Sequence, residues 1–255
     1  MTDAKHYGAA YLSDTGDFLK NIKMQSYEPF AHVQGGVILD LGCGTGMDAI
    51  NLADMLKGKC SVIGVDHDSV LIDKAKADAA DRDNIRFEKG ETHQLPLEDQ
   101  SAAGIRMERV VQHLQEPDLT FAEVYRVLHA EAPFVVVETI WNSLNLYTGM
   151  VETEQKIRNY LVDTKVNNGF AGNKLTADLA RHAFKNIRID TYCMVVRSLD
   201  EANRYLFLER ILSEMVEQDV LTEQEVAEFS AGLLAADKEG FFITSMNIVI
   251  AKATR

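Results

Sequence analysis

One segment constrains the fold of this chain more than any other: residues 37–46 (VILDLGCGTG), an apolar run that ends in an aspartate followed by alternating glycines. Its apolar start is typical of a strand buried on both faces of a parallel sheet. Gly42, Gly44 and Gly46 have no Cβ atom, so the backbone there can approach a ligand closely. Residues 47–56 then carry apolar side chains at helical spacing. The segment therefore predicts a strand, a ligand-binding loop and a helix N-terminus, the first unit of a doubly wound α/β fold.

A second strand and a second carboxylate follow at a distance that suits a nucleotide-like cofactor. Residues 61–65 (SVIGV) predict the next strand, and Asp66 ends it 20 residues after Gly46. A carboxylate at that place binds ribose hydroxyls in dinucleotide-binding folds. A dinucleotide enzyme would place its third glycine at position 47, where this chain has Met47. The dinucleotide interpretation is therefore the weaker one.

Four blocks of the chain, taken in order, resemble the class I S-adenosylmethionine-dependent methyltransferases. The resemblance is to the bacterial small-molecule branch, which is similar to the ubiquinone and menaquinone biosynthesis methyltransferases. The blocks are residues 39–46 (LDLGCGTG), 64–77 (GVDHDSVLIDKAKA), 87–99 (FEKGETHQLPLED) and 105–128 (IRMERVVQHLQEPDLTFAEVYRVL). The resemblance covers residues 37–140 and implies an α/β fold, a doubly wound and mostly parallel seven-stranded sheet.

The resemblance also implies the cofactor, S-adenosyl-L-methionine, and its product, S-adenosyl-L-homocysteine. Asp40 and the backbone of the glycine loop would surround the methionine moiety, and Asp66 would hold both ribose hydroxyls. The implied cofactor-binding residues are Asp40, Gly42, Cys43, Gly44, Thr45, Gly46, Asp66, His67, Leu71, Glu91, Thr92 and Met107.

Five of these residues would contact the adenine end and the amino group of the cofactor. His67 and Leu71 would flank the adenine ring, and the backbone amide of Thr92 would meet it. Glu91 stands where the family usually has an aspartate that accepts a hydrogen bond from the adenine amino group, so the geometry of that contact stays open. Met107, at the end of the fourth predicted strand, would offer its carbonyl to the amino group of the cofactor.

Charge restricts the partners of the chain. Its 26 basic and 39 acidic residues give a formal net charge of -13, which opposes binding to the phosphates of nucleic acids. A small molecule or a protein side chain is therefore the expected acceptor, and no nucleic-acid partner is expected. No stretch has the length and apolar character of a membrane span, and the first residues lack the pattern of a secretory signal.

The cysteines indicate the compartment. Cys43, Cys60 and Cys193 lie far apart and match no metal-binding spacing. This usage fits a reducing cytoplasm, so we expect a cytoplasmic protein with neither disulfides nor a metal.

The remaining patterns predict one domain over residues 1–255, built around a cofactor-binding core at 37–140. Residues 1–36 would form an N-terminal helical cover, with a helix from Asp14 to Phe30. Further strands are expected at 85–88, 104–107, 133–140, 187–196 and 241–251, the last two antiparallel, and further helices at 118–128 and 175–184.

Two insertions are expected to shape the substrate pocket, at residues 141–173 and 199–238. The second contains a predicted helical pair, 199–218 and 222–237, whose later helix starts with the capping-box pattern of Thr222 and Glu225. This pair can form a wall of the pocket or the surface of a homodimer, and both alternatives stay open.

His113 is the candidate catalytic residue. Methyl transfer from a sulfonium requires mainly that the nucleophile is positioned and that water is excluded. A general base is needed only where the acceptor carries its proton at neutral pH. His113 follows the fourth predicted strand and faces the methyl side in similar enzymes, so it is the candidate base. Its alternative role is that of a hydrogen-bonded packing residue beside Val110, Val111 and Leu114.

The sequence thus predicts an S-adenosylmethionine-dependent methyltransferase that acts on an oxygen, nitrogen or carbon atom of a small molecule. One alternative is a protein or nucleic-acid base methyltransferase, although residues 105–114 lack the Asn/Asp-Pro-Pro-Tyr motif that would favour it. The other alternative is a cofactor-binding protein without transferase activity, since no obligatory catalytic residue defines the family.

Overall fold

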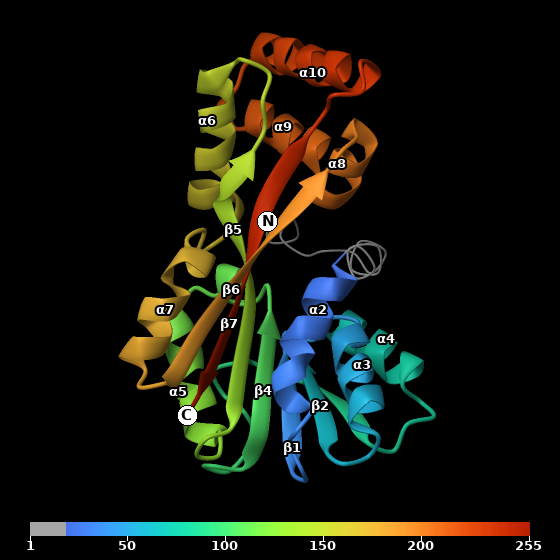
Figure 1. Cartoon of the computed structure of the whole chain (residues 1–255), viewed down its shortest axis with the longest axis vertical. Helices are drawn as coiled ribbons and strands as arrows, with labels where there is room; N and C mark the ends of the chain where they lie inside the picture. Colours follow the sequence, from blue (N-terminus) through green and yellow to red (C-terminus); the bar gives the residue numbers. More distant parts are fainter. Residues whose placement is uncertain (1–18) are drawn as a thin grey trace.

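The computed structural model describes residues 19–255, and these form one seven-stranded sheet with helices on both faces (Figure 1). The strands are β1 (Val37–Leu41), β2 (Ser61–Asp66), β3 (Ile85–Lys89), β4 (Ala102–Glu108), β5 (Pro133–Asn145), β6 (Lys185–Val196) and β7 (Thr244–Thr254). Their order across the sheet is β3-β2-β1-β4-β5-β7-β6. The strands β1 to β5 pair in parallel, whereas β7 runs antiparallel to both of its neighbours. The predicted doubly wound sheet with an antiparallel final pair is confirmed.

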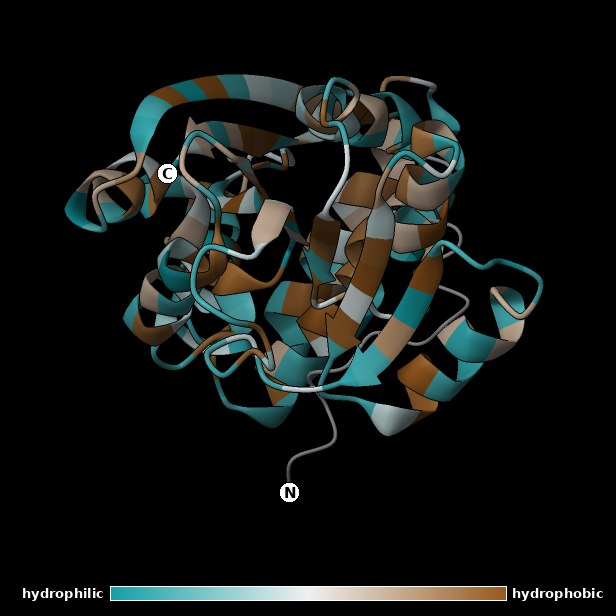
Figure 2. Ribbon diagram, turned by 90° about the horizontal axis from the view of Figure 1, so that it is seen from below, coloured by the Kyte–Doolittle hydropathy of each residue, from teal (hydrophilic) through white to brown (hydrophobic). Residues whose placement is uncertain are grey.

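Helices cover the two faces of the sheet as two separate hydrophobic clusters. On one face lie α2 (Lys20–Tyr27), α3 (Met47–Leu56) and α4 (Ser69–Asp78). On the other face lie α5 (Pro117–Val127) and α7 (Ala171–Arg181). The central strands between these layers are the most consistently hydrophobic part of the molecule (Figure 2), as expected for parallel strands buried on both sides.

The N-terminal helix is anchored by aromatic side chains. Tyr27 at the end of α2 and Phe30 in the following 3₁₀ turn (Glu28–Phe30) are both buried against the sheet. The predicted helix from Asp14 to Phe30 is confirmed only from Lys20, since its first residues, 14–18, lie outside the described part of the chain.

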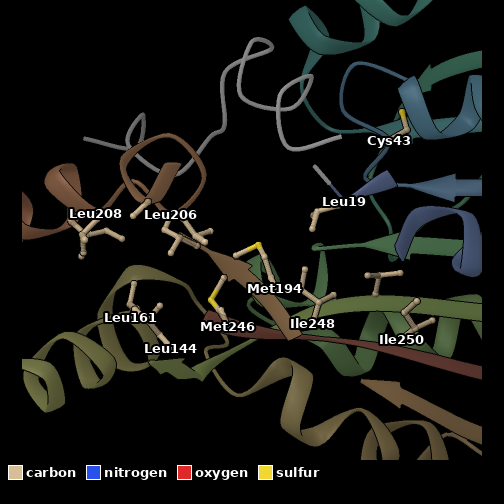
Figure 3. Packing of buried hydrophobic residues seen from close by; sticks show 14 of the residues in the cluster. Leu19, Cys43, Leu144, Leu161, Met194, Leu206, Leu208, Met246, Ile248 and Ile250 are labelled. Carbon is tan, nitrogen blue, oxygen red and sulfur yellow. The ribbon is translucent and has the colours of Figure 1, made fainter. Parts of the chain in front are cut away.

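A helical lobe lies beyond the carboxyl ends of the parallel strands and consists of α6 (Val151–Tyr160), α8 (Leu199–Leu206), α9 (Leu208–Glu217) and α10 (Glu223–Lys238) (Figure 1). The strands β5, β6 and β7 extend past the other strands and reach into this lobe. Its apolar side chains form one continuous cluster with those on the sheet, from Leu208, Leu161 and Leu144 through Met194 and Met246 to Ile248 and Ile250 (Figure 3). The lobe is therefore packed on the sheet rather than tethered to it.

The extension of β5 corrects the prediction that this strand ends at Ile140. The strand continues to Asn145, where the Asn145 carbonyl accepts a hydrogen bond of 2.7 Å from Thr244 Oγ1. Ser143 Oγ likewise accepts a bond of 2.8 Å from the Asn247 backbone. Polar groups of this segment thus form hydrogen bonds with β7. This explains why its amino-acid composition is typical of a loop although it forms a strand.

Two further element boundaries differ from the predictions, and one predicted helix start is confirmed. The predicted helix 199–218 is two helices, α8 and α9, because Phe207 adopts a left-handed conformation with φ of 54° between them. The last strand runs over 244–254 rather than 241–251. The capping box is confirmed: Thr222 Oγ1 accepts from the Glu225 backbone, and the Glu225 carboxylate accepts from the Thr222 backbone at 2.7 Å.

Within residues 19–255, no helix combines the length and the apolar character needed to cross a bilayer.

Candidate functional site

The glycine loop connects the end of β1 to the start of α3. Gly42 and Gly46 have φ angles of 68° and 81°, a region that side chains with a Cβ rarely adopt. Space is also lacking, because a Cβ at Gly42 would lie 2.3 Å from Val110 Cγ2 and one at Gly46 would lie 2.5 Å from the Phe87 ring. The loop conformation therefore depends on glycine for both backbone freedom and packing.

Asp66 ties this loop to the end of β2. Its Oδ2 accepts a hydrogen bond of 2.8 Å from the Gly44 backbone, and its Oδ1 accepts one of 2.9 Å from the Asp68 backbone. Each carboxylate oxygen can still accept a further hydrogen bond from a ligand hydroxyl. His67 follows Asp66, with its Nδ1 3.5 Å from Asp66 Oδ1, and its side chain is exposed. The two predicted carboxylates, Asp40 and Asp66, thus flank one loop.

An open cavity, about 400 Å³ when the open solvent at its mouth is included, lies against the loop. It is lined by Lys23, Asp40, Gly42, Cys43, Gly44, Thr45, Met47, Asp48, Arg106, Glu108 and Arg109. Five of the predicted cofactor-binding residues, Asp40 and residues 42–45, are among these. Burial and the charges of Asp40 and Asp66 raise the pKa of the Cys43 thiol, so Cys43 contributes volume rather than a thiolate nucleophile.

The other predicted residues lie outside the lining of this cavity. Gly46 is the N-cap of α3, and Leu71 is half-buried in the first turn of α4. Glu91 is exposed just after β3. The Thr92 hydroxyl lies 2.8 Å from the Thr120 hydroxyl of α5, which anchors the loop after β3 to that helix.

Met107 is fully buried in β4, and its side chain belongs to the cluster on the α5 and α7 face of the sheet. Only its backbone remains for the predicted contact with the cofactor. That contact, like those of His67, Leu71, Glu91 and Thr92 with the adenine, stays a prediction.

A buried network of charges forms the floor of the cavity, and sequence reasoning missed it. At its centre is Arg106, whose side chain is 1% exposed. Arg106 Nη1 lies 3.1 Å from Asp40 Oδ1, Nη2 donates to Glu108, and Nε donates to Ser26 Oγ at 2.9 Å. An arginine within the otherwise apolar run 102–107 was the available signal, because a charge in a central strand needs buried partners.

The helix α2 closes the network from above. Lys23 Nζ lies 2.6 Å from Asp48 Oδ2 and 3.0 Å from Glu108 Oε1. The Tyr27 hydroxyl donates to Asp48, and the Arg106 guanidinium lies 5.1 Å from the centre of the Tyr27 ring. Residues of α2, α3, β1 and β4 thus share one set of charges, and the N-terminal helix forms one wall of the cavity.

These contacts set the protonation of the carboxylates. Burial raises the pKa of Asp40 to about 7, although the charge of Arg106 opposes the shift. Burial acts in the same direction on Asp48 and Glu108, but Arg106 and Lys23 overcome it and lower the pKa of both. Asp48 and Glu108 are therefore ionised at neutral pH, while Asp40 is poised to take up or release a proton.

The residues around the cavity fit the methionine end of S-adenosylmethionine. That end carries one ammonium and one carboxylate, and the lining offers three cations and three carboxylates. With the cofactor bound, Arg109 and Lys23 would supply positive charge for the carboxylate, and Asp40 would supply negative charge for the ammonium. Within residues 19–255, no cluster of three histidine, cysteine, aspartate or glutamate side chains has the arrangement of a metal site.

His113 lies next to the cavity but does not line it. It ends the 3₁₀ turn Val111–His113, which follows the cavity residue Arg109 in the chain. The buried side chain of Gln112 lies between His113 and Trp141: its Nε2 is 3.1 Å from His113 Nε2, and its Oε1 is 2.7 Å from Trp141 Nε1. The structure brings these three residues together beyond the carboxyl end of β4, beside the extended part of β5.

Glu138, which contacts the backbone of this turn, is a further carboxylate that sequence reasoning missed. It is fully buried in β5; its Oε1 accepts a hydrogen bond of 3.3 Å from the Gln112 backbone, and its Oε2 has no hydrogen-bond partner among residues 19–255. Burial raises the pKa of Glu138 to about 8, although backbone amides, Gln112 first, favour its charged form. Glu138 is therefore mostly protonated at neutral pH.

A family model described as a methyltransferase domain matches residues 38–131 of this chain. An uncharacterized 37.1 kDa protein in transposon TN4556 of Streptomyces fradiae is 28% identical over 240 residues, which is 94% of this chain and 69% of that protein. Demethylmenaquinone methyltransferase of Lactobacillus johnsonii is 28% identical over 125 residues, 48% of each chain.

Among solved structures, phosphoethanolamine N-methyltransferase 2 of Haemonchus contortus, in complex with phosphomonomethylethanolamine and S-adenosylhomocysteine, has the same fold. It superposes with a TM-score of 0.62 at 15% identity, over 99% of this chain and 59% of that one. The shared strand order and the match agree: residues 38–131 form a methyltransferase domain, and this chain has the fold of the class I S-adenosylmethionine-dependent methyltransferases.

Proposed function

We propose that this methyltransferase acts on a small-molecule acceptor bound above the carboxyl ends of β4 and β5, between the cavity and the helical lobe. The observation that carries the proposal is the position of the lobe: the long strands β5, β6 and β7 carry its helices past the carboxyl ends of the parallel strands (Figure 1), the end of the sheet at which the glycine loop that lines the cavity lies. In open α/β sheets, ligands bind outside the carboxyl ends of the strands. The segments 141–173 and 199–238 would then shape the acceptor pocket.

The charge of the chain and the names of its relatives support a small acceptor. A net charge of -13 opposes nucleic-acid binding. The relatives named above include a methyltransferase for demethylmenaquinone and one for phosphoethanolamine. These acceptors differ widely, so the proposal extends to the class of small molecules and leaves the acceptor atom to experiment.

Each part of the site has a proposed role. When bound, S-adenosylmethionine supplies an electrophilic methyl group on a sulfonium. The loop at 42–46 and Asp40 would hold its methionine end, and Asp66 its ribose. His67, Leu71, Glu91, Thr92 and the Met107 carbonyl would contact its adenine and amino groups. His113 would face the acceptor, and the packed lobe would exclude water from the reacting atoms.

Calorimetric titration of the purified chain with S-adenosylmethionine, S-adenosylhomocysteine and NADH tests the cofactor site first. We expect binding of the first two and none of NADH. Transfer of a labelled methyl group to a panel of phenols, quinols, amines and thiols, with a protein extract and RNA as comparison substrates, then tests the acceptor class. Transfer to the extract or the RNA alone would overturn the small-molecule proposal.

A further inference from the structure

The side chain of Gln112 has donor and acceptor ends that cannot be exchanged. Trp141 Nε1 lies 2.7 Å from Gln112 Oε1. An indole nitrogen can only donate, so the oxygen of the Gln112 amide must face Trp141. The amide nitrogen then faces His113, 3.1 Å from its Nε2. Because an amide nitrogen is also only a donor, His113 Nε2 must accept this bond with its lone pair.

This arrangement decides which nitrogen of His113 carries the proton. In a neutral imidazole one nitrogen donates and the other accepts. Since Nε2 of His113 is the acceptor, the proton lies on Nδ1. A proton on Nε2 would place two N–H groups against each other, unless the Gln112 amide rotated and gave up its bond to Trp141.

Three hydrogen bonds hold the backbone of the same turn, so the side chains of Gln112 and His113 keep their relative positions. The backbone N–H of Gln112 donates to Glu138 Oε1 at 3.3 Å, and the backbone carbonyl of Gln112 accepts from the Asn168 backbone at 2.9 Å. The His113 carbonyl accepts from Asn167 Nδ2 at 2.7 Å. With Gln112 fully buried, no solvent water competes for its amide.

We propose that Trp141, acting through Gln112, is a positioning residue that holds neutral His113 in its Nδ1–H tautomer, so that His113 donates a hydrogen bond to the methyl acceptor rather than removing its proton. The inference rests on the proposed function in one respect, that His113 faces the acceptor. It replaces the general-base role predicted from the sequence with that of a donor.

The class of acceptor follows from this role. A donor at Nδ1 stabilises an oxygen anion and takes no proton from it. The acceptor is therefore an oxyanion, a phenolate or an enolate, that enters already deprotonated. Its lone pair forms the bond to the methyl carbon while the carbon–sulfur bond breaks and its electrons stay on sulfur, so the proton count of the protein does not change.

The tautomer can be measured without any substrate. Two-bond ¹H–¹⁵N correlation spectra of the ¹⁵N-labelled full chain distinguish the two nitrogens of each histidine ring, and the spectrum of His113→Gln identifies the signals of His113 among the seven histidines. We expect wild-type His113 to show a protonated Nδ1. Trp141→Phe keeps an aromatic ring but removes the donor, and we expect a mixture of both tautomers.

Tyr147→Phe is the matched control, because Tyr147 is an aromatic residue near the lobe whose side chain is exposed; its removal of one hydroxyl should leave the His113 spectrum unchanged. Gln112→Leu provides a second variant should Trp141→Phe not fold. A wild-type ring protonated on Nε2, or a tautomer that both folded variants leave unchanged, would overturn the proposal.

Once an acceptor is known, the turnover rates of His113 variants distinguish a hydrogen-bond donor at this position from a general base. Asparagine places an N–H near the position of histidine Nδ1 but cannot act as a base. We expect His113→Asn to retain turnover within about 10-fold of wild type, and His113→Ala to lose about 10²-fold. Equal losses in both variants would restore the base. Absence of wild-type turnover on the whole panel would count against the proposed function and leave the measured tautomer standing.

Discussion

Arg106 of β4 and Asp40 of β1 lie directly opposite each other in paired parallel strands, with Arg106 Nη1 3.1 Å from Asp40 Oδ1. Both side chains are almost completely buried. Asp40, the carboxylate that we propose for the methionine end of the cofactor, is therefore also one partner of a structural ion pair. Its protonation depends on burial and on this arginine of the neighbouring strand.

Arg106→Met should destabilise the protein by about 3 to 5 kcal/mol, because it leaves the buried carboxylate of Asp40 without its main counter-charge and removes one of the cations that Glu108 faces. Urea unfolding at neutral pH measures this change. The control is Arg86→Met, since Arg86 is largely exposed and pairs with Glu88 at 2.7 Å; we expect it to cost less than about 1 kcal/mol. Similar values for the two variants would contradict a central structural role of Arg106.

Asp66→Ala should weaken the binding of S-adenosylmethionine by about 1 to 3 kcal/mol, the range for losing hydrogen bonds to a charged group. Its neighbour Asp68 caps α4 by accepting from the Val70 backbone at 2.8 Å, so Asp68→Ala should lower stability by about 1 kcal/mol. Asp68→Ala should leave cofactor affinity nearly unchanged. Calorimetry on both variants compares them, and an unaltered affinity of Asp66→Ala would remove the ribose assignment.

Glu138 should make the protein less stable as the pH rises from about 5 to 8. Its pKa of about 8 in the folded protein lies above the ordinary 4.5, so the folded state keeps a proton that the unfolded state releases in this window. Stability then falls with rising pH, by at most about 1.4 kcal/mol per pH unit for one proton. Asp40, with its pKa raised to about 7, adds a slope of the same sign at lower pH.

Glu138→Gln should reduce this slope, because a glutamine does not titrate. The comparison is clearest between about pH 7 and 8, above the window of Asp40. Urea unfolding of wild type and variant at several pH values measures the two slopes. If the slopes are equal, the Glu138 carboxyl is not protonated in the folded protein.

Thr222→Ala should destabilise the protein by about 1 kcal/mol through loss of the cap of α10. Thr222→Ser is the matched control, since serine keeps the hydroxyl that accepts from the Glu225 backbone. Thermal unfolding of the three proteins distinguishes the cases. A serine variant as unstable as the alanine variant would show that the methyl group of Thr222, and not its hydroxyl, matters.

The sequence by itself determined the cofactor half of the molecule. Local apolar periodicity predicts the strand and helix at 37–56 and the strand that ends at Asp66. The closely spaced glycines between the first strand and helix predict a tight loop with positive φ angles. Chain order then predicted the parallel sheet, because consecutive strand–helix units pack in few ways. The capping box of α10 was equally local and equally predictable.

Tertiary structure alone decided the charge network and the His113 turn. Lys23, Asp48 and Arg106 lie far apart in the chain. The attraction between their charges becomes strong enough to offset the cost of burying them only when all of them are packed together away from water. The tautomer of His113 likewise depends on Trp141, which reaches Gln112 only because β4 and β5 are neighbours in the sheet. Periodicity records which side chains turn inward, but the identity of the partner that each buried charge or donor meets is fixed only when the strands and helices pack together.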